Sequence, residues 1–124
     1  MPDIQWLQYG IETIHFIQYT MPSLGASVYT DMRIRWDEAK RQEVLRRRQI
    51  DFASLHDLLS RPYIEDQLYD DPEQYRVIGF VQGRLVTFII EYRQDTIEEY
   101  MWVVTAWHAT TQEQQAYERE IHEA

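Results

Sequence analysis

A pair of strand-like runs in the second half of the chain constrains the fold more than any other feature. Tyr75–Val81 and Arg84–Tyr92 are rich in β-branched and aromatic residues and flank the dipeptide Gln82-Gly83. This spacing predicts a β-hairpin. The second run is almost continuously apolar, which is typical of a central strand covered on both faces. A further run, Tyr100–Ala106, follows a short loop, so we expect a three-stranded antiparallel meander.

The segment before the meander predicts a strand followed by a helix. Arg33–Trp36 alternates as a short strand with two apolar side chains on one face. Asp37 follows the strand and is a favourable N-cap for a helix that continues to about Arg48. This helix has few apolar side chains, so only a narrow stripe of it is expected to be buried.

Three further segments complete the predicted elements. Asp51 is placed to cap a second helix, Phe52–Leu59, whose apolar side chains form a core-facing surface. Residues 63–74 are acidic and rich in tyrosine, and they predict a loop. Thr110-Thr111-Gln112-Glu113 has the form of a capping box, which predicts a terminal helix through about His122.

These elements predict an α+β domain of two layers. Their order is β-α-α-β-β-β-α, with the strands in an antiparallel sheet. The expected core comprises Leu85, Phe88, Ile90, Val103 and Trp36, with Phe52, Leu55 and Leu59 packed on it.

Residues 1–31 differ from the rest and are interpreted as an N-terminal extension of unknown role preceding a domain at 32–124. The spacing of Ile4, Leu7, Ile11 and Ile14 suits a helix face, whereas the composition of residues 13–20 suits a strand. The sequence does not decide between them.

The composition excludes several classes of site. The chain of 124 residues has no Cys, which excludes a disulfide framework, a thiolate zinc site and a cysteine nucleophile. A chain without Cys suits a reducing cytoplasm. The longest uncharged run, Thr13–Thr30, contains Pro, Gly and many polar residues, so we expect no membrane span and a cytoplasmic location.

The charge is unevenly distributed along the chain. The formal net charge is −9, yet residues 33–48 hold seven basic and only three acidic side chains. Such a segment can attract phosphates or an acidic partner locally, because charges are screened beyond about 8–10 Å. In the alternative interpretation, its arginines pair with acids of the same helix, which is worth a few tenths of a kcal/mol per pair.

A set of short motifs is spread over residues 32–119 and begins with the run from Met32 to Lys40. The set continues through Ile50-Asp51-Phe52, Glu73 to Gly79 with Arg76, Gly83-Arg84-Leu85-Val86, Arg93 with Asp95, and Thr105 to Thr110 followed by Glu113 and Tyr117. Together these motifs resemble the BrnT family of toxin–antitoxin ribonucleases. The resemblance implies a RelE-like fold and cleavage of mRNA. It also implies neutralisation by a ribbon-helix-helix (BrnA-like) antitoxin, through which alone operator DNA is contacted.

The chain departs from the family pattern at two places. Family members commonly have Asn and then His-Gly near the end of the first helix, where this chain has Val44, Arg48 and Gln49. They usually have Arg at the position of Trp107. A second interpretation is therefore a catalytically decayed relative that serves as a protein-interaction or co-repressor module.

Cleavage of RNA without a metal needs a base, an acid and cations that stabilise charge on the phosphate. Arg76, Arg84 and Arg93 are expected at strand ends, where with Lys40 they would form a phosphate cradle. In the alternative interpretation, each pairs with a nearby acid. Arg48, at the end of the basic helix, is a further candidate for binding substrate.

His108 is the candidate acid or base, because imidazole is the side chain that titrates near neutral pH. Its position before a helix start also suits a surface or capping residue. Glu73 and Tyr92 are additional candidates for proton transfer, and Tyr92 also for substrate binding. The sequence has no cluster of His and carboxylates at ligand spacing, so the prediction is a metal-independent endoribonuclease without cofactors.

Overall fold

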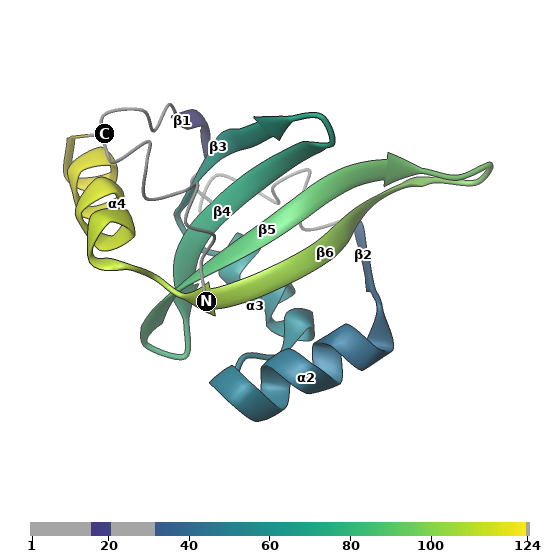
Figure 1. The fold of residues 1–124 in the computed structure, drawn as a ribbon. Helices are drawn as coiled ribbons and strands as arrows, with labels where there is room; N and C mark the ends of the chain where they lie inside the picture. Colours follow the sequence, from purple (N-terminus) through teal and green to yellow (C-terminus); the bar gives the residue numbers. More distant parts are fainter. Residues whose placement is uncertain (1–15, 21–31, 124) are drawn as a thin grey trace.

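The computed structural model describes residues 16–20 and 32–123, which form one six-stranded sheet with helices packed against it (Figure 1). The strands are β1 (Phe16–Thr20), β2 (Arg33–Trp36), β3 (Tyr63–Asp70), β4 (Glu73–Val81), β5 (Arg84–Gln94) and β6 (Glu99–His108). The helices are α2 (Glu38–Arg48), the short 3₁₀ turn η3 (Phe52–Ser54), α3 (Leu55–Leu59) and α4 (Thr111–Glu123). None of these helices is long and apolar enough to cross a bilayer. The predicted α+β class is confirmed.

The predicted meander forms the centre of the sheet. Strands β4, β5 and β6 pair antiparallel in sequence order. The turn between β4 and β5 is Gln82-Gly83, and both residues have positive φ, 51° and 79°. Residues 86–90 of β5 are all buried, as expected for a strand covered on both faces.

The loop predicted at residues 63–74 is wrong, because most of it is the strand β3. Strand β3 pairs antiparallel with β4, from Tyr63 opposite Gly79 to Asp70 opposite Glu73. Its acidic residues suggested solvent, but Glu65 and Asp66 are each only 2% exposed. Asp66 lies opposite Arg76 and forms an ion pair with it, so the burial of this carboxylate is compensated.

The two strands at the ends of the sheet also differ from the prediction. Strand β2 pairs parallel with β6, so the sheet is mixed rather than antiparallel. At the other end, β1 pairs antiparallel with β3. This strand lies within the predicted N-terminal extension and agrees with the strand alternative for residues 13–20. The possible helix from Ile4 to Ile14 lies outside the described residues.

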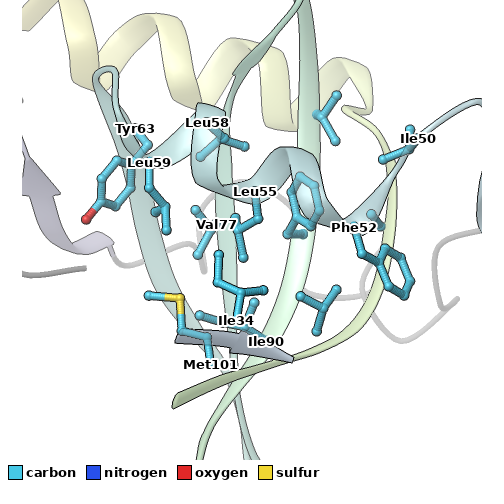
Figure 2. Packing of buried hydrophobic residues seen from close by; sticks show 14 of the residues in the cluster. Ile34, Ile50, Phe52, Leu55, Leu58, Leu59, Tyr63, Val77, Ile90 and Met101 are labelled. Carbon is cyan, nitrogen blue, oxygen red and sulfur yellow. The ribbon is translucent and has the colours of Figure 1, made fainter. Parts of the chain in front are cut away.

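Helices α2 and α3 cover one face of the sheet (Figure 1). Asp37 caps α2 as predicted, because its carboxylate accepts hydrogen bonds from the backbone N–H groups of residues 39 and 40. The predicted second helix is the turn η3 followed by α3. Its side chains pack on the sheet, as Figure 2 shows for Phe52, Leu55, Leu58 and Leu59, all fully buried. Of the predicted core, Phe88, Ile90 and Val103 join this cluster and Trp36 borders it.

Helix α4 packs against the opposite face, so one end of the sheet has helices on both faces and the two-layer prediction is incomplete there. Ala116 and Tyr117 of α4 pack against Ile64 and Ile78 in a second core cluster. Tyr63 and Val77 directly precede these two residues in their strands, so they point to the opposite face and belong to the first cluster, beneath α2 and α3. Leu85 was predicted in the first cluster but lies in this second one. The predicted capping box is confirmed: Glu113 N–H donates to Thr110 Oγ1, and Thr110 N–H donates to Glu113 Oε1.

Candidate functional site

A pocket of about 580 Å³ lies where the end of α2, the β4–β5 turn and the end of β6 meet. This volume is typical of a site for a small ligand or one nucleotide. Its apolar walls are Leu45, Ile50, Val81 and Val86, and its polar lining is Gln49, Asp51, Ser54, Gln82, Arg84 and His108. Two of the residues predicted from the sequence, Arg84 and His108, therefore line the same cavity.

The ring of His108 is held in a defined orientation. Strand β5 places His108 opposite Val86 in the sheet register. The Nε2 atom of His108 lies 2.8 Å from the backbone carbonyl oxygen of Arg48. A carbonyl only accepts hydrogen bonds, so Nε2 carries the proton in this contact. The contact leaves Nδ1 as the basic atom of the neutral ring, with no hydrogen-bond partner in residues 16–20 and 32–123.

Arg48 connects the helix to the strand through its backbone and its side chain. Its Nη1 donates a hydrogen bond to the carbonyl oxygen of Ala106, at 2.8 Å. Together with the His108 contact, this bond fastens the end of α2 to the end of β6. Arg48, the third predicted residue at this end of the sheet, is half-buried and positions the imidazole.

The distribution of ion pairs distinguishes this end of the sheet from the rest of the surface. Eight of the twelve basic side chains have a carboxylate partner: Arg33, Arg35, Lys40, Arg41, Arg47, Arg61, Arg76 and Arg93. Within the described ranges, Arg46, Arg48, Arg84 and Arg119 have none. One of these four, Arg84, lines the pocket, so its positive charge is left available there in an otherwise acidic protein.

The one acidic side chain in the pocket lining does not neutralise Arg84. Asp51 accepts two hydrogen bonds from Arg41, whose Nε and Nη2 lie 2.9 and 3.1 Å from the two carboxylate oxygens. Asp51 also accepts a bond from the backbone N–H of Ala53. The hydrogen bonds from Arg41 hold the pKa of Asp51 below its ordinary value. This carboxylate is therefore committed to Arg41 and to the start of η3.

The four cations of the predicted cradle are not brought together. Arg84 and Arg93 lie at opposite ends of β5, which is roughly 30 Å of extended strand. Arg93 pairs with Glu91 at 2.7 Å, and its guanidinium lies 4.3 Å from the centre of the Trp102 ring. The predicted strand Arg84–Tyr92 already implies this separation, because Arg84 begins the strand and Arg93 follows its other end.

The other two cations of the predicted cradle are committed elsewhere. Arg76 is only 2% exposed and forms an ion pair with Asp66, because β4 begins at Glu73 and places Arg76 inside the strand. Lys40 lies 3.5 Å from Glu43 on the surface of α2. The alternative interpretation, pairing with nearby acids, therefore describes Arg76 and Lys40, as it does Arg93.

The two candidates for proton transfer besides His108 lie at the far end of the sheet. Glu73 is exposed at the first position of β4. The hydroxyl of Tyr92 donates to Oε2 of Glu65 at 2.5 Å. Burial raises the pKa of Glu65 to about 7, although the bond from Tyr92 opposes the rise. Glu65 was missed because it lies in the segment predicted as a loop.

Gln49 and Gln82 are the pocket residues that sequence reasoning missed. Gln49 directly follows α2, and Gln82 lies in the hairpin turn. The sequence predicted the helix end and the hairpin turn in which they lie, but only the tertiary structure places both residues at one pocket.

Comparisons with known proteins add no identification to this geometry. No protein-family model matches the chain, and no curated protein matches it. Among residues 16–20 and 32–123, no group of three or more His, Asp or Glu side chains is arranged to hold a metal ion. The resemblance to the BrnT family therefore stays a prediction, and the pocket carries the functional argument.

Proposed function

We propose that the protein is a ribonuclease toxin of the BrnT kind, a divergent RelE-like domain that cleaves mRNA at the pocket bordered by Arg48, Arg84 and His108. The observation that carries this proposal is that one pocket is lined by the oriented imidazole of His108 and by the guanidinium of Arg84, which has no carboxylate partner in the described structure. An imidazole serves as a general base, and guanidinium groups match the oxygens of a phosphate.

In the proposed reaction, Nδ1 of His108 removes the proton of a ribose 2′-hydroxyl. The 2′-oxygen attacks the adjacent phosphorus, the bond to the 5′-oxygen breaks, and a 2′,3′-cyclic phosphate forms. The leaving 5′-oxygen takes a proton from water at the open pocket. Arg84 stabilises the charge that develops on the phosphate, and the Arg48 carbonyl holds the imidazolium that forms. Since the nucleophile belongs to the RNA, no bound metal is needed to generate one.

The test is cleavage of a labelled single-stranded RNA by the purified protein in excess EDTA. We expect cyclic-phosphate products, and we expect His108→Ala to lower the rate by at least about 100-fold, the usual contribution of a general base. His56→Ala is the matched control, because His56 is an exposed histidine on α3 that does not line the pocket. Activity that needs an added divalent ion, or cleavage of a substrate with 2′-deoxyribose at the scissile position, would contradict the mechanism.

The proposed antitoxin is a ribbon-helix-helix protein with an acidic segment that covers the end of α2. Arg41 and Arg47 are already paired with Glu38 and Glu43 within the helix, whereas Arg46 and Arg48 have no carboxylate partner in the described structure. An acidic segment bound there would steer association and would cover the end of α2 that borders the pocket. Reversal of Arg46, Arg47 and Arg48 to Glu should weaken binding of the neighbouring-gene product and remove its salt dependence. Unchanged affinity at two salt concentrations would exclude this site of neutralisation.

The second candidate function is binding without catalysis. It is favoured by the commitment of Lys40, Arg76 and Arg93 to carboxylates, which leaves the pocket with fewer cations than the family resemblance predicted. Expression in a heterologous bacterium without any partner separates the two candidates. Growth arrest with loss of mRNA supports the enzyme, and unchanged growth supports the interaction module.

A further inference from the structure

Two residues with unusual backbone conformations line the same pocket. Gln49 and Gln82 are the non-glycine residues with positive φ in the described part of the chain, at 57° and 51°. Both line the pocket that contains His108 and Arg84. They come from different elements, since Gln49 caps the end of α2 and Gln82 is the first residue of the β4–β5 turn.

Glutamine is a costly choice at both positions. A left-handed residue at a helix end is usually Gly or Asn, because a Cβ is strained at positive φ. The tight turn of a hairpin with two positive φ values likewise prefers Asn, Asp or Gly at its first central position. Strained backbone of this kind persists mostly at functional sites. The backbone conformation therefore favours Gly at both positions. We attribute the presence of Gln instead to an interaction that its side chain makes.

The amide groups have hydrogen-bonding capacity to spare. Gln82 is exposed, and its amide has no hydrogen-bond partner within residues 16–20 and 32–123. The Nε2 atom of Gln49 donates to the carbonyl oxygen of Arg46 at 3.2 Å, which leaves its Oε1 able to accept. An amide offers a donor beside an acceptor, whereas a phosphate accepts only. Arg84 and His108 suit the phosphate, so the amides suit a base edge that carries both kinds of group.

We infer that Gln82 and Gln49 read the base of a single-stranded RNA bound in the pocket, with adenine preferred. This inference rests on the proposed function and gives its specificity. A Gln amide pairs with adenine through two hydrogen bonds, one to the amino group and one to a ring nitrogen. Unpaired bases in single strands expose these edges to a protein. The partly exposed side chain of Leu45 lines the same cavity and offers an apolar surface to the face of the base.

The test measures binding separately from cleavage. Fluorescent hexamers of adenosine, cytidine or uridine with 2′-O-methyl groups lack the proposed nucleophile, so they bind without being cut. We expect the unmodified protein to bind the adenosine hexamer about tenfold more tightly than the other two, within the range for a bidentate pair. Gln82→Gly should remove most of this preference, and Gln49→Gly a smaller part. Gln42→Ala, on the surface of α2 away from the pocket, should leave it unchanged.

Thermal unfolding of the same variants gives an independent readout. Because Gly relieves the strain at positive φ, each Gly variant should unfold at a higher temperature, by about 3 °C. Loss of adenine preference with a raised Tm supports the inference, since a damaged fold would lower the Tm. If the adenine preference is lost in the Gly variants but no RNA is cut by the unmodified protein, the inference still holds for a protein that binds RNA without cleaving it.

Two results would overturn the inference. Equal preference in the unmodified protein and in both Gly variants would exclude the amides as base-reading groups while leaving the proposed cleavage intact. Failure of the unmodified protein to bind any of the hexamers would remove both this inference and the proposed substrate.

Discussion

Glu65→Gln should make the stability of the protein much less dependent on pH. Glu65 lies on β3, is only 2% exposed, and accepts a hydrogen bond from the Tyr92 hydroxyl. Burial, with a smaller contribution from the neighbouring charge of Asp66, raises its pKa from 4.5 to about 7. Glutamine has nearly the same shape, and its carbonyl can accept the same bond without carrying a charge.

The sign and the size of the effect follow from the two pKa values. Since the folded protein holds the Glu65 proton more tightly than the unfolded chain, the stabilisation is fully present below about pH 4.5. It is lost as the pH rises through about 7. The separation of the two values corresponds to about 3 kcal/mol, of which about 2–3 kcal/mol falls between pH 5 and pH 8. Over that interval, the Gln variant should gain this amount of unfolding free energy relative to the unmodified protein.

Urea unfolding followed by tryptophan fluorescence at pH 5, 6, 7 and 8 measures this difference. Glu73→Gln is the matched control, because Glu73 is an exposed glutamate at the start of β4 and should change the pH dependence little. Tyr92→Phe removes the donor to the carboxylate, so the pKa of Glu65 should rise further and the transition should move to higher pH. A difference between the Gln variant and the unmodified protein that is constant from pH 5 to pH 8 would refute the reasoning.

Three substitutions test the packing, each measured by the same unfolding assay. Phe88→Ala should cost about 3–5 kcal/mol, because the ring is fully buried, and a cost below about 1 kcal/mol would contradict its place in the core. Gly79→Ala should cost about 1–3 kcal/mol, because a Cβ there would lie 2.8 Å from Cγ of Leu58; an unchanged stability would show that α3 can move aside. Asp66→Ala should cost about 3–5 kcal/mol by removing the carboxylate that accepts hydrogen bonds from the buried Arg76, and a neutral result would mean that Glu113, whose Oε2 lies 3.8 Å from Nη1, compensates the charge alone.

Elements with local signals could be predicted from the sequence. Asp37 and the Thr110 to Glu113 capping box marked helix starts, because a cap depends on residues within one turn. The Gln82-Gly83 turn was predicted for the same reason. Strand β3 was missed because its buried Glu65 and Asp66 look like solvent-exposed acids in the sequence. Their burial depends on cross-strand partners, Tyr92 for Glu65 and Arg76 for Asp66, which are 27 and ten residues away.

The residues of the site were predicted in part. His108 and Arg84 were expected at strand ends, and the antiparallel pairing of β5 with β6 places both ends on one side of the sheet. Arg76 and Arg93 do not join them, because the hairpin places both toward the end of the sheet away from the Gln82-Gly83 turn, as the predicted strands already imply. Gln49 lines the pocket only because α2 packs against the sheet, and no local pattern in the sequence of α2 predicts where that packing places its end.

The parallel pairing of β2 with β6 has a consequence for the order in which the molecule is made. Arg33 lies opposite Tyr100 in the register, so β2 is synthesised long before its partner strand. Helix α2 depends on β6 in the same way, since Arg48 contacts both Ala106 and His108. While β3, β4 and β5 leave the ribosome, the basic helix has no strand to receive it. Long-range pairing of this kind forms slowly. The pocket therefore cannot be complete until His108 itself has been added, and its assembly requires β6 to pair with β5 and β2.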